Sequence, residues 1–200
     1  MKIYQLIFIV LFFILLAGCQ SKSGSKNNET SQEESAGKET PGQKSASDRQ
    51  PDVAIHEAAL SGNLEAVKSH VENGTDLETT NQDGHTPLML ASFNGHTDVA
   101  EYLIDNGAKV NVTDNQNLTP LHFAASGEFP ETVELLLKNG AEINATDNIE
   151  NFTPLMYAAA EGNPEVVKIL LKYDADISMV DEDGDDAETF ARQNNHGEIV

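Results

Sequence analysis

The stretch Thr119-Pro120-Leu121-His122 decides the fold of this chain, because it recurs at a regular interval. Thr86-Pro87-Leu88 stands 33 residues before it, and Thr153-Pro154-Leu155 stands 34 residues after it. A degenerate copy, Ala54-Ile55-His56-Glu57-Ala58-Ala59, lies 33 residues before the first of these. A repeat of this length predicts an all-α solenoid, in which each unit buries its apolar face by stacking on its neighbours.

Each copy has the pattern of two helices joined by a turn. The repeated threonines are placed to cap the first helix, and the prolines occupy its first position, where no hydrogen-bond donor is lost. Small alanines follow the leucines at i, i+3, which lets neighbouring first helices approach closely. The second helices are predicted to begin with capping residues at Asn63, Thr97 or Asp98, Glu131 and Asn163. Their predicted buried faces contain Val67, Val71, Val99, Leu103, Ile104, Val133, Leu136, Leu137, Val166, Val167, Leu170 and Leu171.

These units resemble the ankyrin repeat, and the resemblance covers residues 52–200. It implies an ankyrin-repeat solenoid with copies at about 52–80, 81–113, 114–146 and 147–180, followed by a partial C-terminal cap at 181–200. Gly74, Gly107 and Gly140 fall where a left-handed residue ends the second helix. The fourth copy has Asp174 at this position, a departure that we expect to lower its stability.

The resemblance gives two histidines a structural role. His56 and His122 occupy the histidine position of the motif, and in the family this side chain links loops by hydrogen bonds. The spacing between Pro120 and Pro154 contains one extra residue, which must lie in the turn 147–152. Insertions of this kind occur in loops, commonly on the binding face. Neutral drift explains the insertion equally well.

The N-terminal residues 1–18 have the pattern of a secretion signal. Lys2 is followed by an apolar run at 6–16, which is shorter than the ~20 residues of a membrane-spanning helix. The run ends in Leu16-Ala17-Gly18-Cys19, which resembles the lipobox of bacterial lipoproteins. The resemblance implies cleavage before Cys19 and lipidation of Cys19, which would anchor the protein to a bacterial membrane on its extracytoplasmic side. An ordinary signal peptide or an uncleaved anchor is the alternative.

Residues 19–51 and the residues that follow differ sharply in composition. After Cys19 the segment is polar and without large apolar residues, so we expect a disordered tether. Its five basic and five acidic residues cancel, whereas the chain beyond Pro51 carries 6 basic and 28 acidic residues of the chain's 33. A body this acidic repels nucleic acid and anionic headgroups, which excludes nucleic-acid binding and favours basic proteins or cations as partners.

The sequence contains no recognisable catalytic or metal-binding motif. No nucleophile–base pair, phosphate-binding glycine loop or histidine cluster with metal-ligand spacing is present, so no catalytic residue, metal or cofactor is predicted. The acidic run 181–186 invites a calcium hypothesis, but Met179 and Phe190 would fall at ligand positions of an EF-hand loop. A solvated turn on a charged cap is the simpler interpretation.

The resemblance also implies where a partner would bind. In ankyrin arrays the turn tips and the exposed side of the first helices form the recognition surface. The matching positions here are Gln82, Asp83, His85, Phe93, Asn94, Asn115, Gln116, Leu118, Ile149, Glu150, Phe152, Glu161, Glu182 and Asp183. Phe93, Leu118 and Phe152 are apolar where exposure is expected, so they either anchor a partner or cover gaps between repeats.

The pattern as a whole predicts a monomeric, lipid-anchored ankyrin-repeat protein of the bacterial cell envelope that binds another protein and is not an enzyme. Two narrower alternatives remain. One is an inhibitor or immunity protein that blocks a basic toxin or hydrolase, which the acidity favours. The other is a cation-dependent envelope stress factor without a single tight partner.

Overall fold

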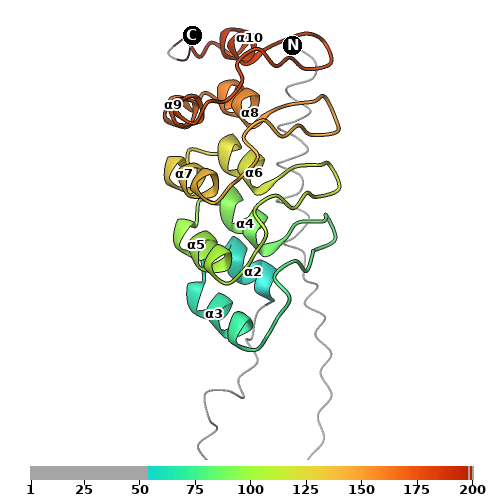
Figure 1. The fold of residues 1–200 in the computed structure, drawn as a ribbon, viewed down its shortest axis with the longest axis vertical. Coiled ribbons are helices and arrows are strands. Elements are labelled where there is room, and N and C mark those ends of the chain that lie inside the picture. The colour runs from blue at the N-terminus through green and yellow to red at the C-terminus, as the bar shows by residue number, and fades with distance from the viewer. Residues whose placement is uncertain (1–53, 198, 200) are drawn as a thin grey trace, which may run out of the picture. The chain divides into compact units, whose positions relative to one another are not determined.

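A computed structural model describes residues 54–197 and 199, and within them the predicted all-α solenoid is confirmed. The described residues form helices and turns only, and the helices stack in order along one axis (Figure 1). The predicted signal peptide, Cys19 and the tether lie outside the described residues. The helices are α2 (Ile55–Leu60), α3 (Leu64–Glu72), α4 (Pro87–Phe93), α5 (Thr97–Asp105), α6 (Pro120–Ser126), α7 (Pro130–Lys138), α8 (Pro154–Glu161), α9 (Pro164–Lys172) and α10 (Ala187–Gln193).

The first helices of the hairpins begin as the sequence predicts. Thr86 and Thr153 each accept a hydrogen bond from the backbone N–H three residues later, at 3.4 and 3.3 Å. At α6 the hydroxyl of Thr119 instead lies 2.9 Å from Nδ1 of His122. Proline follows the threonine in all three helices, so the lost N–H is one that would have had no helical partner.

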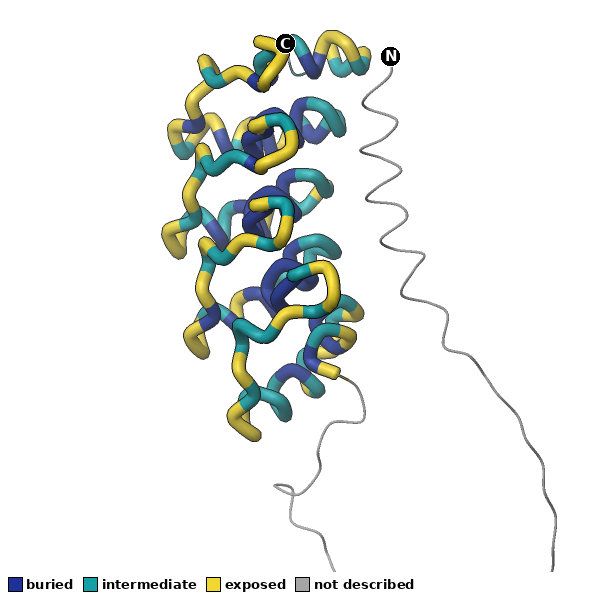
Figure 2. Tube along the Cα trace, turned by 90° about the vertical axis from the view of Figure 1, so that its right-hand side faces the viewer, coloured by how far each residue is buried: buried dark blue, intermediate teal, exposed yellow. Residues whose placement is uncertain are grey.

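Two rows of helices pack side by side along the stack. The first helices α2, α4, α6, α8 and α10 contact one another in sequence, and the second helices α3, α5, α7 and α9 do the same. Alanines at the centre of the first helices, such as Ala58, Ala91, Ala124 and Ala158, are fully buried, because close approach leaves no room for larger side chains. Figure 2 shows exposed turns standing in front of this buried row.

The starts of the second helices differ from the prediction. Only Asn63 caps its helix with a side-chain oxygen, which accepts from the N–H of Ala66. His96 and Asn163 occupy the same position but reach back to the preceding repeat, where they contact the carbonyls of Leu60 and Gly127 at 3.0 and 2.9 Å. The predicted caps Thr97 or Asp98 and Glu131 are wrong, because these residues lie inside α5 and α7, whose N-cap residues are His96 and Phe129. Asn163 is the N-cap residue of α9 as predicted, but its side chain connects repeats and makes no capping bond.

The apolar faces of the second helices are confirmed for most residues. Val67, Leu103, Leu136 and Leu170 are buried, as are their neighbours on the same faces. Val71, Ile104 and Leu137 are half-buried. Leu171 was predicted to be buried and is 44% exposed, because among the described residues no second helix follows α9.

The left-handed helix ends are confirmed. Gly74, Gly107 and Gly140 have φ of 73°, 97° and 84°, and Asp174 takes the same conformation with φ of 65°. A non-glycine residue in this region is strained, so the fourth repeat keeps the geometry at an energetic disadvantage. Within residues 54–197 and 199, no helix combines the length and the apolar character needed to cross a membrane.

Candidate protein interface

Each turn of the stack is organised by one Asn or Asp side chain. Oδ1 of Asn81, Asp114, Asp147 and Asp181 accepts hydrogen bonds from backbone N–H groups within the same turn, at 2.8 to 3.2 Å. The sequence analysis missed these four residues. The signal was available, since each stands five or six residues before the cap of the next helix.

The extra residue of the fourth copy lies in the predicted turn. In the other turns the organising residue donates its N–H to the carbonyl four residues later, whereas Asp147 donates to the carbonyl of Phe152, five residues later. The longer turn places Ile149 at its tip, 45% exposed. Neighbouring turns are joined through the backbone, because Asn148 donates to the carbonyl of Gln116 and Glu182 donates to that of Glu150.

Three of the predicted partner-binding residues are buried, and their assignment to an exposed surface is wrong. His85, Leu118 and Phe152 occupy the position before each capping threonine and are almost completely enclosed. The ring of His85 packs edge-on against Phe123 of the next repeat, with centroids 5.1 Å apart. Phe152 lies 4.7 Å from Phe190 of the unit that follows. His85 and Phe152 therefore cover junctions between repeats, and Leu118 is enclosed in the same position of its own repeat.

The remaining predicted residues do reach the surface. Phe93 is half-buried, with one edge against Phe123 at a centroid distance of 6.1 Å. The exposed members of the predicted set are Gln82, Asp83, Asn115, Ile149, Glu182 and Asp183, and the half-buried ones are Phe93, Asn94, Gln116, Glu150 and Glu161. The side-chain amide of Asn94 donates a hydrogen bond to the carbonyl of Leu60, so this donor is already occupied within the stack.

The two motif histidines have the predicted structural role. Nε2 of His56 lies 2.9 Å from the carbonyl oxygen of Thr79, and Nε2 of His122 lies 3.2 Å from that of Phe152. Burial lowers the pKa of His122. Each ring therefore ties a first helix to the loop that follows its repeat.

Two organising acids also make buried contacts with rings. Oδ2 of Asp147 accepts from the Tyr157 hydroxyl at 2.8 Å, and burial together with this carboxylate raises the pKa of Tyr157. Oδ2 of Asp114 lies 3.4 Å from Nε2 of His85, and both side chains are enclosed. The first contact ties the turn 147–153 to α8. The second brings two neighbouring turns together, although Oδ2 of Asp114 accepts no hydrogen bond.

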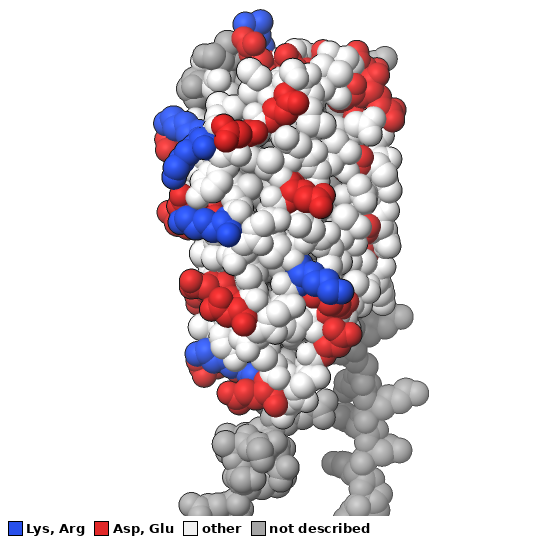
Figure 3. Space-filling view, viewed as in Figure 1, with Lys and Arg blue, Asp and Glu red and all other residues white. Residues whose placement is uncertain are grey.

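Lys and Arg are absent from the four turns of the stack, whereas acidic residues occur both in the turns and on the second helices. The turns 81–86, 114–119, 147–153 and 181–186 contain nine acidic residues and no Lys or Arg. The basic residues beyond Pro51 lie elsewhere, mainly on the second helices, as the blue side chains of Figure 3 show. Most are paired, for example Lys68 with Glu65 at 2.8 Å and Lys172 with Glu134 at 2.9 Å.

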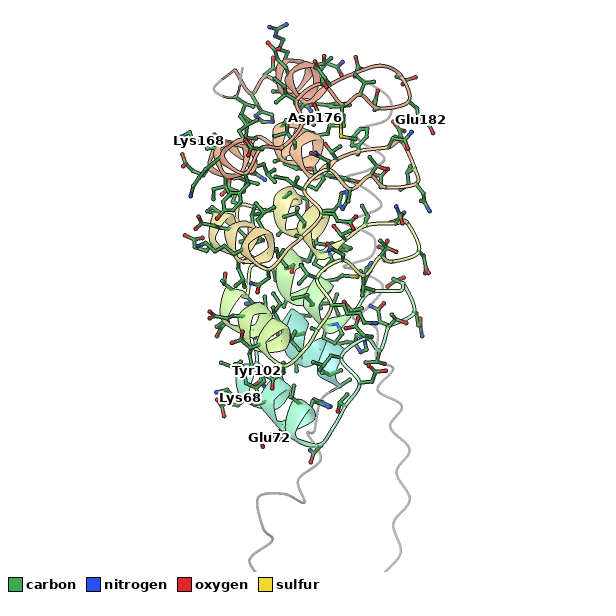
Figure 4. All side chains as sticks on the ribbon, in the orientation of Figure 1. Lys68, Glu72, Tyr102, Lys168, Asp176 and Glu182 are labelled. Carbon is green, nitrogen blue, oxygen red and sulfur yellow. The ribbon has the colours of Figure 1, made fainter. Side chains whose placement is uncertain are left out.

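The acidic side chains crowd one another most strongly in the last two turns. Burial raises the pKa of Glu150, and nearby Asp181, Asp183, Asp147 and Glu182 raise it further. Burial also raises the pKa of Glu161. Figure 4 labels Glu182 at the tip of the last turn, on the opposite side of the stack from Lys168 of α9. A positively charged ligand at the turn side would relieve this repulsion.

The acids of the last turn already have partners within the protein. Asp181 accepts two backbone N–H groups, and Asp186 caps α10 by accepting from the N–H and hydroxyl of Thr189. In the part of the chain that the structure describes, no group of three or more His, Cys, Asp or Glu side chains has an arrangement that could hold a metal ion.

The stacked hairpins and their turns define the class of helical repeat proteins that act as binding scaffolds. Within that class the chain belongs to the ankyrin-repeat family: a model of ankyrin repeats in three copies matches residues 55–147, and a model of ankyrin repeats in many copies matches residues 130–171 and 155–200. Family membership supports a role in protein–protein interaction.

Two curated relatives share a short segment with the chain. Protein phosphatase 1 regulatory subunit 27 of Mus musculus and that of Homo sapiens are each 51% identical to it over 39 residues. The aligned segment covers 20% of this chain and 25% of each relative.

Proposed function

We propose that this protein is a non-enzymatic binding module that holds a basic protein partner on its turn face, defined as the exposed residues Gln82, Asp83, Asn115, Ile149, Glu182 and Asp183. The observation that carries the proposal is that the four turns contain nine acidic residues and no Lys or Arg. Such a face attracts a basic partner at long range and orients it before contact.

The backbone of the turn face supports the same function. Each turn is fixed by its Asn or Asp side chain, and the last three turns are hydrogen-bonded to one another. A rigid surface loses little conformational entropy on binding, so more of the interaction energy contributes to affinity. Ile149 adds an apolar contact at the centre of the acidic surroundings.

The relatives fit a non-catalytic role. Their printed name describes a regulatory subunit of a phosphatase, and a regulatory subunit acts through another protein. The shared segment is too short to carry the identity of that partner to this chain. The acidic face also suits the narrower role of an inhibitor or immunity protein for a basic toxin or hydrolase, in which the partner is itself an enzyme.

The test uses photo-cross-linking in the producing cell. A photoreactive residue at Ile149 is expected to capture a basic protein, whereas the same residue at the exposed Glu101 of α5 is not. Replacing Asp83, Glu182 and Asp183 by their amides removes three charges from exposed side chains and is expected to weaken that capture at least tenfold. Binding of the purified partner is expected to weaken steeply with salt.

A matched control separates the turn face from overall charge. Replacing Glu101, Asp105 and Glu131 by their amides removes the same number of charges from exposed positions on the second helices. We expect this variant to retain the partner. If both triple variants lose it equally, net charge and not the turn face determines binding, and the proposal is wrong.

We further propose that Cys19 carries the lipid that holds the protein in the bacterial envelope. The support is the sequence Leu16-Ala17-Gly18-Cys19, in which the chain's single cysteine stands at the lipidated position of the motif. Cys19→Ser is expected to move the protein from the membrane fraction to the soluble fraction and to remove the acyl mass. A Cys19→Ser protein that stays membrane-bound would indicate an uncleaved apolar anchor instead.

A further inference from the structure

Two apolar side chains on the turn side of the stack are exposed. Ile149, in the turn 147–153, is 45% exposed, and Val180, which immediately precedes the turn 181–186, is 50% exposed. Contact with a partner would remove this apolar surface from water, which favours binding. These two side chains therefore bear on the kind of segment that the turn face binds.

Val180 is an exception in a row of polar residues. It corresponds to Thr80, Thr113 and Thr146 of the three preceding repeats. Thr80 and Thr113 are exposed and Thr146 is half-buried, although another unit of the stack follows each of them. The exposure of Val180 is therefore a property of the position, and only its apolar character is peculiar to the last unit.

Ile149 is a second exception of the same kind. Two residues after the organising Asn or Asp, the other turns carry the polar residues Asp83, Gln116 and Asp183. The backbone of Ile149 is fixed, because its N–H donates to Oδ1 of Asp147 at 3.2 Å, while its side chain is left exposed. The turns 81–86 and 114–119 have no exposed large apolar side chain, so the apolar surface is confined to the last two turns.

The two exceptions lie on neighbouring turns that are joined through their backbones. The N–H of Glu182 donates to the carbonyl of Glu150 at 3.1 Å, one residue from Ile149 and two residues from Val180. These two turns hold seven of the nine turn acids and no Lys or Arg. Burial and the acids around it raise the pKa of Glu150, which shows that the carboxylates are close enough to repel one another. The apolar pair is therefore surrounded by negative charge without a counter-ion from the turns.

We propose that the last two turns, together with Val180, form an anchoring subsite that binds one large apolar side chain of the basic partner, flanked on both sides by Lys or Arg. The inference rests on the proposed function and specifies the chemistry of the segment that the turn face binds. Ile149 and Val180 contact the apolar side chain, and Glu150, Glu182 and Asp183 pair with the flanking cations. Exclusion of water by the apolar contact strengthens the surrounding charge pairs.

The test probe is a labelled, lysine-rich peptide with a single leucine at its centre. The matched control peptide has serine in place of the leucine and is otherwise identical. Because the two peptides carry the same charge, the difference in their affinity for the full-length protein measures the apolar contact alone. The leucine peptide is expected to bind about threefold to tenfold more tightly than the serine peptide.

Substitutions in the protein locate the apolar contact. Ile149→Gln combined with Val180→Thr gives each position a residue that another repeat carries there, and both positions are exposed. This variant is expected to bind the two peptides equally, with the affinity of the serine peptide unchanged. The control is Leu171→Gln combined with Ile177→Thr, which changes two exposed apolar side chains outside the turns and is expected to keep the preference for leucine.

The outcomes separate this inference from the proposed function. If the parent binds both peptides equally, or if the preference for leucine survives in the Ile149→Gln, Val180→Thr protein, the anchoring subsite is wrong. Salt-sensitive binding of both peptides would then still support the proposed function. Loss of the preference only in the control variant also overturns the inference, because the apolar contact then lies away from the turns. If neither peptide binds, the proposed function fails together with the inference.

Discussion

The middle repeats and the outer repeats of the stack differ at equivalent positions. In the middle, Asn111 uses both ends of its amide, donating to the carbonyl of Gly140 and accepting from the N–H of Glu142. In the first repeat Glu78 replaces this asparagine; one carboxylate oxygen accepts from the N–H of Lys109, and the other is buried without a hydrogen-bond partner. The fourth repeat has left-handed Asp174 in place of glycine.

The difference shows that a repeat tolerates local departures when its packing is intact. Solenoid stability is approximately a sum of terms for each repeat and for each interface, so one poor hydrogen bond or one strained residue lowers a single term. The helices of the outer repeats still stack on their neighbours in the same two rows. Each departure is therefore expected to be correctable by one substitution.

The largest effect is expected from breaking the junction between the fourth repeat and the unit after it. Phe152→Ala removes a buried ring that packs against Tyr157 and Phe190, and is expected to destabilise the protein by about 3–5 kcal/mol. Urea unfolding followed by circular dichroism measures the loss. Phe93→Ala, at a half-buried ring, is the control and is expected to have a much smaller effect; equal losses would contradict the assignment of the two rings.

The structural features that lie within a single repeat could be predicted from the sequence. The caps at Thr86 and Thr153, the left-handed Gly107 and the structural role of His122 were predicted, because each depends on neighbours a few residues away or on the family motif. The turn insertion was also located, since a spacing of 34 in place of 33 has to be accommodated outside the helices.

The candidate surface was predicted less well, because exposure depends on the adjacent unit. Leu118 and Phe152 occupy positions where the family's pattern led us to expect exposure, but both are buried, and Phe152 packs against Phe190 of the next unit. The prediction for Leu171 is wrong in the opposite sense: its pattern is that of a buried residue, but among the described residues no second helix follows α9 to cover it. Neither outcome can be read from the repeat that contains the residue.

Converting the first repeat to the middle pattern is expected to have the next largest effect. Glu78→Asn replaces the unpartnered buried oxygen with an amide that can donate to the carbonyl of Gly107, as Asn111 does to Gly140. A gain of about 1–2 kcal/mol is expected from urea unfolding at neutral pH. The reverse substitution, Asn111→Glu, is the matched control and is expected to lose a similar amount. A Glu78→Asn protein no more stable than the parent would refute the comparison.

A smaller gain is expected from correcting the fourth repeat. Asp174→Gly removes a side chain from a left-handed position and is expected to stabilise the protein by about 0.5–1 kcal/mol. The matched control is Gly107→Asp, which transfers the strain to a middle repeat where no neighbouring atom would obstruct the new side chain. Thermal unfolding is expected to move in opposite directions for the two variants. A loss of stability in Asp174→Gly would mean that Asp174 makes a contact that outweighs its strain.

The smallest effect is expected in the acidic turns, and its pH dependence identifies the cause. Burial and the surrounding acids raise the pKa of Glu150 above 4.5, so the folded state becomes less stable as pH rises from 4.5 through the raised value. Glu150→Gln is therefore expected to gain a few tenths of a kcal/mol of stability at pH 7 and nothing below pH 4.5.

Glu134 has the opposite effect on stability. Lys172 and Lys138 lower its pKa to about 2, so its stabilising contribution is present above pH 4.5 and disappears as pH falls through about 2. Glu134→Gln is thus expected to lose stability at pH 7, and the two variants are expected to converge on the parent in acid. If Glu150→Gln gains equally at both pH values, the gain comes from packing, and repulsion among the turn acids is too weak to favour a basic partner.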